Sequence, residues 1–291
     1  MAREMLVGAP RERLLAGMPV TERTIEAAGI PTAVLEGGSG EPLVLLHGPG
    51  EHAVKWVGVL PGLVSTHSVV APDLPGHGAT SVTGGPLTAE EMLDWLDALI
   101  GATCASPPAL VGQIAGGAMA MHYAALHGDR VARLVLVDTL GLAPFQPAPE
   151  FAAALTEYLA APDAGTFDRL WRRCAYDFER VRARMGERWE SLEAYTLERM
   201  RAPGGREAVG ALMEQFGFPP IPADVIARIA VPVTLIWGRH DLATPLAVAE
   251  AASARYGWPL HVVEDAADDP SMDQPERFLE LLRRVLGGGE P

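Results

Sequence analysis

Cysteine is scarce in this 291-residue sequence, which contains only Cys104 and Cys174. The two residues are far apart and neither belongs to a metal-ligand spacing, so the sequence offers no disulfide framework and no cysteine-based metal site. Such cysteine usage is typical of a reducing compartment, and we expect a cytoplasmic protein. We expect no metal and no other cofactor.

Positive charge is also in short supply. The chain has 23 lysine and arginine residues against 37 aspartate and glutamate residues, which gives a formal net charge of -14 at pH 7. Nucleic acids and anionic membranes both require a basic patch on the protein that binds them. We therefore expect neither as a partner. A small-molecule ligand is the expected partner, and the sequence leaves the oligomeric state open.

Long apolar runs are absent as well. No stretch approaches the roughly 20 apolar residues that a membrane-spanning helix needs. Residues 1–20 are interrupted by charged side chains, so they lack the apolar core of a secretory signal; these are Arg3, Glu4, Arg11, Glu12 and Arg13. We expect a soluble chain.

What the sequence does contain is an alternation of short apolar runs and helical patterns. Such alternation predicts a mostly parallel sheet covered by helices on both faces. The expected strands are Thr21–Ala27, Pro31–Glu36, Pro42–His47, Ser68–Ala71, Ala109–Val111, Arg133–Asp138, Val231–Trp237 and Pro259–Glu264. The expected helices of this layer are His52–Val64, Leu87–Ile100, Ala115–His127, Ala247–Tyr256 and Pro275–Leu286.

The alternation stops between residues 144 and 222, where the pattern is helical throughout and prolines stand at both ends. Helical spacing predicts helices at Phe151–Leu159, Thr166–Arg184, Trp189–Arg201 and Arg206–Phe216. We interpret 144–222 as a helical cap inserted into an α/β core. The core would then consist of residues 1–143 and 223–291.

The most informative stretch follows the strand Ala109–Val111. It reads Gly112-Gln113-Ile114-Ala115-Gly116, the frame of the G-x-S-x-G nucleophile elbow, in which a strand turns sharply into a helix. The centre of the frame normally carries a nucleophile, but Ile114 has none. An elbow also holds its central residue at positive φ, which costs a β-branched residue roughly 1–3 kcal/mol. We expect Ile114 to carry this strain and to form the floor of a pocket.

With these motifs the chain resembles the α/β-hydrolase superfamily, in the branch of lidded esterases, C–C bond hydrolases and epoxide hydrolases. The resemblance covers nearly the full length. It depends on the elbow frame and on four further blocks, which are His47-Gly48, residues 71–78 (Ala-Pro-Asp-Leu-Pro-Gly-His-Gly), residues 235–241 (Leu-Ile-Trp-Gly-Arg-His-Asp) and residues 275–278 (Pro-Glu-Arg-Phe). It implies an α/β-hydrolase fold with an inserted helical cap.

The resemblance also implies where catalytic residues should lie. The nucleophile position is Ile114, the acid position is Asp241, and Asp268 stands where the family has histidine. The oxyanion hole of the family uses two backbone N–H groups. One corresponds to Ala115 and the other to Pro49, which has no N–H, unless a one-residue shift gives that role to Gly50.

The candidate catalytic residues are therefore Asp241 and Asp268. Two carboxylates about 4 Å apart repel by roughly 4 kcal/mol at an effective dielectric of about 20, so we expect the pair to share a proton near neutral pH. The candidate binding residues surround the elbow and the oxyanion loop, and they are Pro49, Gly50, Glu51, His52, Gln113, Ile114 and Ala115.

Three functions fit a chain of this family without a nucleophile and histidine. The first is a non-covalent enzyme of specialised metabolism, such as an epimerase, isomerase, cyclase or lyase, acting on a small, largely apolar carbonyl compound. The second is a ligand-binding pseudoenzyme, and the third is a hydrolase that uses carboxylate-activated water. Convergence of acid–base groups on the pocket beside Ile114 would favour the first over the second.

Overall fold

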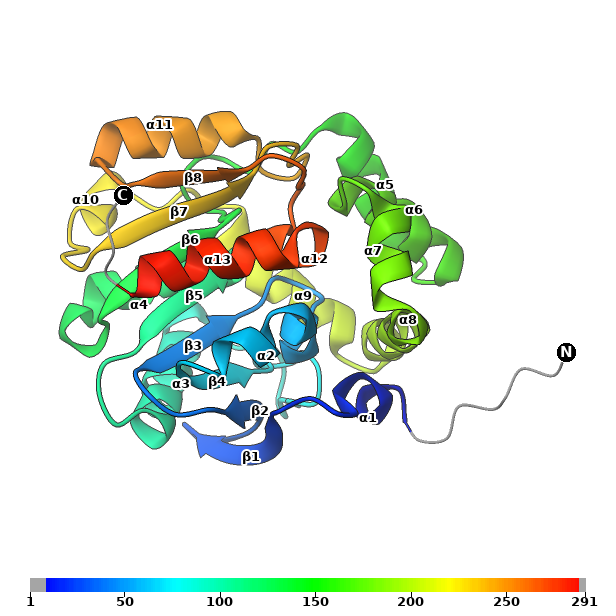
Figure 1. The fold of residues 1–291 in the computed structure, drawn as a ribbon, viewed down its shortest axis with the longest axis horizontal. Helices are drawn as coiled ribbons and strands as arrows, with labels where there is room; N and C mark the ends of the chain where they lie inside the picture. The colour runs from blue at the N-terminus through cyan, green and yellow to red at the C-terminus, as the bar shows by residue number, and fades with distance from the viewer. Residues whose placement is uncertain (1–8, 288–291) are drawn as a thin grey trace, which may run out of the picture.

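The computed structural model describes residues 9–287 and contains one eight-stranded sheet in the order β1-β2-β4-β3-β5-β6-β7-β8 (Figure 1). β1 and β2 form an antiparallel hairpin, β2 is antiparallel to β4, and the remaining neighbours are parallel. This arrangement confirms the predicted fold class, a mostly parallel sheet flanked by helices.

The strands are β1 (Thr21–Ala27), β2 (Ile30–Gly37), β3 (Pro42–Leu46), β4 (Ser68–Pro72), β5 (Ala109–Gln113), β6 (Arg133–Val137), β7 (Val233–Gly238) and β8 (Leu260–Val263). The α-helices are α1 (Pro10–Leu15), α2 (Leu60–Leu63), α3 (Ala89–Thr103), α4 (Ala115–Leu126), α5 (Pro149–Ala160), α6 (Ala164–Cys174), α7 (Phe178–Met185), α8 (Glu187–Arg201), α9 (Gly205–Leu212), α10 (Ala223–Ile226), α11 (Leu246–Tyr256), α12 (Pro270–Asp273) and α13 (Pro275–Leu286). Two short 3₁₀-helices, η1 (Ala53–Gly58) and η2 (Gly128–Arg130), and a π-helical turn, η3 (Met213–Gly217), complete the elements.

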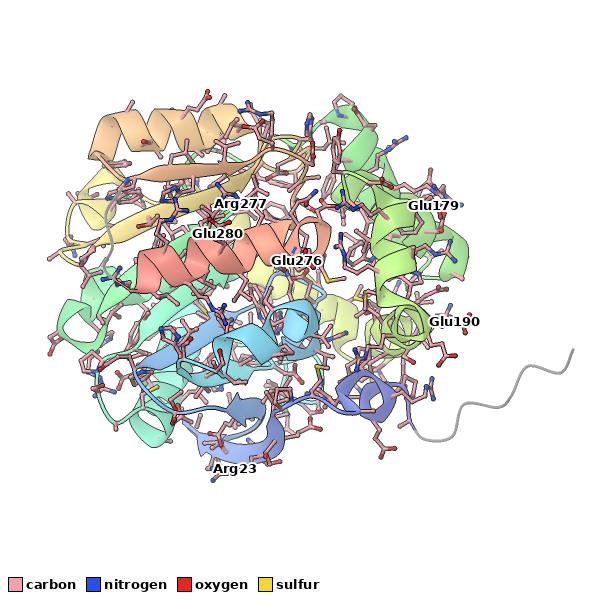
Figure 2. All side chains as sticks on the ribbon, in the orientation of Figure 1. Arg23, Glu179, Glu190, Glu276, Arg277 and Glu280 are labelled. Carbon is pink, nitrogen blue, oxygen red and sulfur yellow. The ribbon has the colours of Figure 1, made fainter. Side chains whose placement is uncertain are left out.

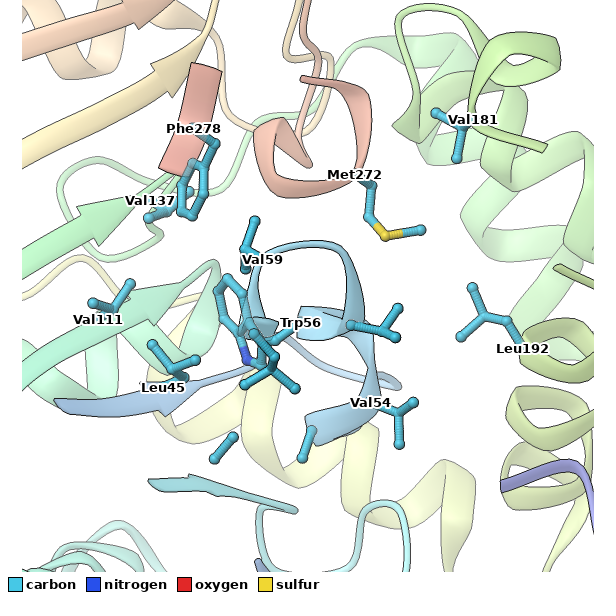
Figure 3. Close-up of a cluster of buried hydrophobic side chains, with 14 of the residues drawn as sticks. Leu45, Val54, Trp56, Val59, Val111, Val137, Val181, Leu192, Met272 and Phe278 are labelled. Carbon is cyan, nitrogen blue, oxygen red and sulfur yellow. The ribbon is translucent and has the colours of Figure 1, made fainter. Parts of the chain in front are cut away.

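Apolar side chains cover both faces of the sheet. In β3, Leu43 and Leu45 join one buried cluster while Val44 and Leu46 join the other, as the alternation of side chains along a strand requires. On the first face, Trp56 of η1 lies beside Phe278 of α13, with 6.4 Å between ring centroids (Figure 3). Helices α3 and α4 supply much of the second face. The central strands β3 and β5 are buried along their whole length and read as continuous apolar runs because water reaches neither face, whereas the edge strand β1 is mostly exposed.

The start of α3 is a capping box. The Thr88 hydroxyl accepts a hydrogen bond from the N–H of Glu91, and the Glu91 carboxylate accepts one from the N–H of Thr88. This reciprocal pair satisfies two backbone donors that the first turn of a helix leaves free.

Between β6 and β7 the described chain has helices and no strand, with α5 to α8 gathered at one side of the sheet (green in Figure 1). The division of the chain into a core and a cap at residues 144 and 222 stays a prediction, and both predicted core segments extend beyond the described residues. One predicted helix is wrong. Thr166–Arg184 is two helices, α6 and α7, because Ala175 is extended and the Asp177 carboxylate caps a new helix by accepting from the N–H of Arg180.

Two other helix predictions need correction. Residues 52–64 form the 3₁₀-helix η1 followed by the single turn α2, with Pro61 at the start of that turn. A proline fits the first positions of a helix but cannot continue one. Residues 206–216 are α9 followed by the π-helical turn η3. In each case the apolar spacing is met by a mixture of helical geometries.

Charged side chains extend from the surface helices and the hairpin into solvent (Figure 2). Several of them form exposed ion pairs, such as Arg23 with Glu36 at 2.8 Å and Arg277 with Glu280 at 2.8 Å. Exposed pairs of this kind contribute about 0–1 kcal/mol each. In the part of the chain that the structure describes, every helix is too short or too polar to cross a bilayer.

Candidate active site

The turn between β5 and α4 has the strained geometry of a nucleophile elbow. Ile114 has φ 52° and ψ -119°, a region that a β-branched residue adopts at a cost of roughly 1–3 kcal/mol. The turn is closed by glycines that leave no room for a side chain. A Cβ atom on Gly112 would lie 2.5 Å from Gly117 Cα, and one on Gly116 would lie 2.5 Å from the His47 carbonyl oxygen. The predicted strain at Ile114 is confirmed.

A cavity with a volume of about 170 Å³ lies at the elbow, with Ile114 in its wall. Most of the other lining residues are apolar and come from the segment between β6 and β7. They include Phe145, Phe151, Leu155, Tyr158, Phe167, Leu170, Trp171, Leu192, Met200, Val209, Met213 and Phe218. Of the predicted binding residues, Pro49, Gly50, Glu51, His52 and Ile114 line this cavity.

The other two predicted binding residues are absent from the described cavity wall. Gln113 is fully buried in β5, and its Nε2 donates to the backbone oxygen of Asp268 at 2.8 Å. Ala115 is the first residue of α4 and is fully buried. Ligand contact of these two residues, for Ala115 through its backbone N–H, therefore stays a prediction. The strand holds Gln113 behind the elbow, where its hydrogen bond fixes the loop that carries Asp268.

Glu51 folds back over the oxyanion loop. Its Oε2 accepts a hydrogen bond from the N–H of Gly48 at 2.6 Å, and its Oε1 lies 3.2 Å from Lys55 Nζ. Lys55 Nζ lies in turn 3.1 Å from Asp269 Oδ2. All three residues line the cavity. Burial raises the pKa of Glu51, whereas the two neighbouring carboxylates raise the pKa of Lys55 against the effect of burial. Lys55 therefore stays charged between Glu51 and Asp269.

Asp268 lines the cavity and is only 4% exposed. Its pKa is raised well above the ordinary value, first by burial and then by the negative charges of Asp241, Asp269 and Glu51. Cys174 of α6 also lines the cavity, and burial followed by the nearby charge of Asp268 raises the pKa of its thiol well above the usual range. Cys174 is accordingly a neutral thiol and not a thiolate.

Asp241 lies outside the described cavity wall and is paired with a second acid, Asp138. Asp241 Oδ1 accepts from the N–H groups of Ala243 and Thr244 at 2.7 and 2.8 Å, and Asp138 Oδ1 accepts from the N–H of Gly238 at 2.8 Å. Among residues 9–287, no N–H or hydroxyl group donates to Oδ2 of Asp138 or to Oδ2 of Asp241. A proton held by one of these two carboxyls is therefore the donor available to the other.

The two acids titrate together. Burial raises the pKa of Asp241 to about 7, and burial together with the charge of Asp241 raises that of Asp138 well above normal. The Asp138 carboxyl donates to Asp241 and thereby opposes the rise in the pKa of Asp241. Because Asp241 and Asp268 also raise the pKa of Asp138, three buried acids interact where the sequence predicted two.

Sequence reasoning missed Lys55, Asp269 and Asp138. Asp138 directly follows β6 at the carboxyl edge of the sheet, where open α/β sheets bind their ligands, and its φ of 43° places it in a strained turn. Lys55 is four residues after Glu51, a spacing that brings side chains together on a helix. Asp269 precedes Pro270 and accepts from the N–H of Met272, so it has the sequence signal of a helix cap as well. Position at a strand end was therefore the strongest available signal.

The histidines near the site are neutral. His47 is fully buried and accepts from the N–H of Leu74 at 3.0 Å, and burial lowers its pKa well below the ordinary value. His52 lines the cavity, contacts Thr196 Oγ1 at 3.2 Å through Nε2, and has its pKa lowered to about 3, chiefly by burial. Over residues 9–287, no three His, Cys, Asp or Glu side chains are grouped so that they could hold a metal ion.

The sheet, the strained elbow and the cavity at the strand ends define a protein of the alpha/beta hydrolase fold, and the model of that family matches residues 41–275. The chain therefore belongs to the α/β-hydrolase family. It is 36% identical over 284 residues to 2-hydroxymuconate semialdehyde hydrolase of Pseudomonas sp. (strain CF600), covering 92% of this chain and 94% of that one. It is 32% identical over 267 residues to pimeloyl-[acyl-carrier protein] methyl ester esterase of Aromatoleum aromaticum, covering 84% and 98%.

Solved structures show the same fold. The meta-cleavage product hydrolase of Pseudomonas fluorescens IP01 superposes with a TM-score of 0.78 at 24% identity, covering 94% of this chain and all of that one. Naproxen esterase of Bacillus subtilis superposes with a TM-score of 0.82 at 19% identity, covering 95% of each chain. At these identities the likeness supports the fold alone.

Proposed function

We propose that this α/β-hydrolase-family protein is an enzyme that uses no serine nucleophile and moves protons on a small, largely apolar carbonyl compound, as an epimerase, isomerase, cyclase or lyase does. The observation that carries the proposal is the convergence of Glu51, Asp268, Asp269 and Lys55 on the cavity beside Ile114. The central residue of the elbow offers no hydroxyl, thiol or carboxylate, so a covalent intermediate at that position has no chemical basis.

The proposed chemistry needs one acid and one base. Asp268, which keeps its proton because of burial and neighbouring acids, donates that proton to the carbonyl oxygen of the ligand. Glu51, in its ionised form, takes a proton from the carbon next to the carbonyl, and an enol results. Return of a proton to either face or to another carbon gives epimerisation or isomerisation. A positioned acid or base of this kind contributes typically about 10²–10⁴ to a rate.

In this scheme Asp241 acts through Asp268. It shares a proton with Asp138 behind the cavity wall, and its charge raises the pKa of Asp268. Gln113 holds the same loop by its hydrogen bond to the Asp268 backbone oxygen. Both are positioning residues, because neither lines the described cavity.

The other candidate is hydrolysis by carboxylate-activated water, which is favoured by the names of the relatives, a semialdehyde hydrolase and a methyl ester esterase. A pure ligand-binding role fits the apolar walls, but it gives no reason for buried polar atoms without partners, such as His52 Nδ1. We therefore rank proton transfer first.

Exchange of carbon-bound hydrogen tests the proposal. Small molecules that co-purify with the protein are identified by mass spectrometry, and carbonyl compounds of that type are incubated with the protein in deuterium oxide. We expect deuterium to enter at the carbon next to the carbonyl, and we expect Asp268→Asn to lower the exchange rate about 10²-fold or more. Asp265→Asn removes an exposed carboxylate from the same loop and serves as the matched control.

Two results would count against proton transfer. One is the absence of exchange for every carbonyl compound tested. The other is the release of carboxylic acid from esters at a rate that depends on Asp268, which would establish hydrolysis in place of proton transfer.

A further inference from the structure

The polar floor of the cavity carries a specific balance of charge. Among the lining residues, three are carboxylic acids, Glu51, Asp268 and Asp269, and Lys55 is the one lysine or arginine on the described wall. His52, the lining histidine, is neutral because burial lowers its pKa to about 3. Acids thus outnumber cations on the surface that a ligand head group would meet.

The single cation is already engaged. Lys55 Nζ lies 3.2 Å from Glu51 Oε1 and 3.1 Å from Asp269 Oδ2, and it stands 4.7 Å from the centre of the Trp56 ring. The side chain is only 5% exposed. A ligand carboxylate that approached Lys55 would have to displace one of these two carboxylates, and a buried carboxylate without its partner is costly.

We propose that the cavity selects ligands with an uncharged, hydrogen-bond-accepting head group, such as a ketone or lactone carbonyl, and rejects ligands that end in a carboxylate. The inference rests on the proposed function only in placing the ligand in this cavity. It concerns binding, so it can be true or false whether or not a proton moves.

Three features support an uncharged acceptor. Asp268, whose pKa is raised by burial and by neighbouring acids, offers an O–H donor in its protonated form, and a carbonyl oxygen accepts from such a donor. The remaining wall is made of aromatic and aliphatic side chains such as Phe167 and Trp171, which suit a hydrocarbon body. A ligand carboxylate would instead add a further negative charge at short range in a poorly solvated space.

One feature of the site favours anions, and it is outweighed. Helix α4 begins directly after Ile114, and a helix N-terminus carries roughly half a positive charge. Three acids and one already paired lysine face the same space. The balance at the floor therefore stays unfavourable to a carboxylate.

A matched pair of probes tests the inference. 2-Octanone and octanoate have the same chain length and differ in the charge of the head group. We expect calorimetric titration at pH 7.5 to show octanoate binding at least about tenfold more weakly than 2-octanone, which corresponds to about 1.4 kcal/mol.

A charge variant sharpens the test. Asp269→Asn removes one acid and frees Lys55 from one of its partners, while asparagine still caps α12. We expect octanoate binding to strengthen about tenfold relative to 2-octanone binding. Asp265→Asn removes an exposed charge from the same loop and should change neither. If Asp269→Asn fails to fold, Glu51→Gln makes the same test from the other partner of Lys55.

Equal binding of the two probes by the unmodified protein would overturn the inference, as would binding of neither. A failure of octanoate to gain from either variant would also contradict it. Tight ketone binding without deuterium exchange would instead refute the proposed function and leave this inference standing.

Discussion

Asp73 and a group of three other buried aspartates have opposite electrostatic surroundings. Asp73, after β4, accepts from the N–H groups of Ala53 and Ala79, each at 2.7 Å, and pairs with Arg11 at 2.9 Å. The three-acid group consists of Asp138, Asp241 and Asp268, which lie near the carboxyl ends of the last strands. Within the described chain none of these three forms an ion pair with arginine or lysine, and their nearest charged neighbours are largely other acids.

The contrast distinguishes Asp73, whose interactions stabilise the fold, from the three acids Asp138, Asp241 and Asp268, whose arrangement indicates a function. The Arg11 guanidinium also donates to Tyr195 Oη at 3.0 Å and to Glu22 at 2.6 Å, so it ties α1 to the hairpin, to the turn after β4 and to α8. The three acids accept backbone hydrogen bonds at Asp138 and Asp241, but their mutual repulsion raises the free energy of the folded state at neutral pH. Strongly shifted acids beside a cavity are typical of functional sites.

The largest expected effect comes from breaking the ion pair between Arg11 and Asp73. Arg11→Met leaves Asp73 buried without its cation, and losing one partner of a buried pair typically costs about 3–5 kcal/mol. We expect that loss in the free energy of unfolding measured with urea at pH 7. Arg23→Met removes the exposed partner of Glu36 and should cost no more than about 1 kcal/mol. Similar losses for the two variants would show that the Arg11 pair has no special structural role.

The second prediction concerns the three-acid group. A buried acid whose pKa is raised binds its proton more tightly in the folded state, so its stabilising contribution is complete below pH 4 and is lost as the pH rises through the folded pKa, which is about 7 for Asp241. Asp268→Asn removes the free-energy cost of either ionising this buried acid beside other acids or keeping it protonated above its unfolded pKa. We expect it to raise the free energy of unfolding at pH 7.5 by about 1–3 kcal/mol, the scale of like-charge repulsion at an effective dielectric of about 20.

Thermal unfolding between pH 5 and 8 measures this difference. The decline of melting temperature with pH should be smaller in Asp268→Asn than in the unmodified protein. Asp73→Asn is the opposite control, since it weakens the pair with Arg11 and should lower stability across the range. A neutral or destabilising effect of Asp268→Asn at every pH would show that Asp268 does not interact with the other acids.

Local rules of sequence predicted the scaffold of the molecule. The order of strands and helices followed from apolar runs, because strands buried on both faces must be continuously apolar. The elbow followed from Gly112 and Gly116, since backbone atoms lie where any other side chain would have to go. Positive φ at Ile114 then followed from the frame itself. Local steric rules therefore gave the scaffold of the site.

The electrostatic partners did not follow from local rules. Lys55 and Asp269 are far apart in the sequence and meet only because η1 and α12 pack together. The pairing of Asp241 with Asp138 depends on β6 lying beside β7. The break between α6 and α7 was missed because apolar spacing continues through it, and only the cap at Asp177 marks it. Contacts between distant segments, which decide the chemistry, required the structure.

The third prediction measures the strain at the elbow. Glycine is ordinarily less stable than alanine in a helix or strand by roughly 0.5–1 kcal/mol, but alanine is penalised where φ is positive. We expect Ile114→Gly to be more stable than Ile114→Ala by about 1 kcal/mol, measured by urea unfolding. Alanine is already present at position 115, in the first turn of α4, so Ala115→Gly supplies the control and should be destabilising. The usual order of glycine and alanine at position 114 would indicate a relaxed turn in solution.

The smallest expected effect is the absence of a reaction with a fluorophosphonate. Thr196 is the one serine or threonine on the described cavity wall, and its hydroxyl lies 3.2 Å from Nε2 of His52. This geometry resembles a nucleophile with its base, but the His52 pKa of about 3 makes the imidazole a weak proton acceptor, since basicity near the operating pH is what an efficient general base needs. We therefore expect no covalent adduct by intact-mass spectrometry and no release of nitrophenol from short-chain esters above background.

The variant Ile114→Ser shows whether the missing hydroxyl at the elbow is the only cause of this inertness or whether an activating base is missing as well. It places a hydroxyl at the elbow, but the histidine on the described cavity wall, His52, has a pKa of about 3, so we expect the variant to remain unreactive as well. An adduct on Thr196 in the unmodified protein would establish a nucleophile outside the elbow and would contradict the non-covalent mechanism. An adduct that forms only in Ile114→Ser would instead show that the elbow retains its activating surroundings and lacks only the hydroxyl.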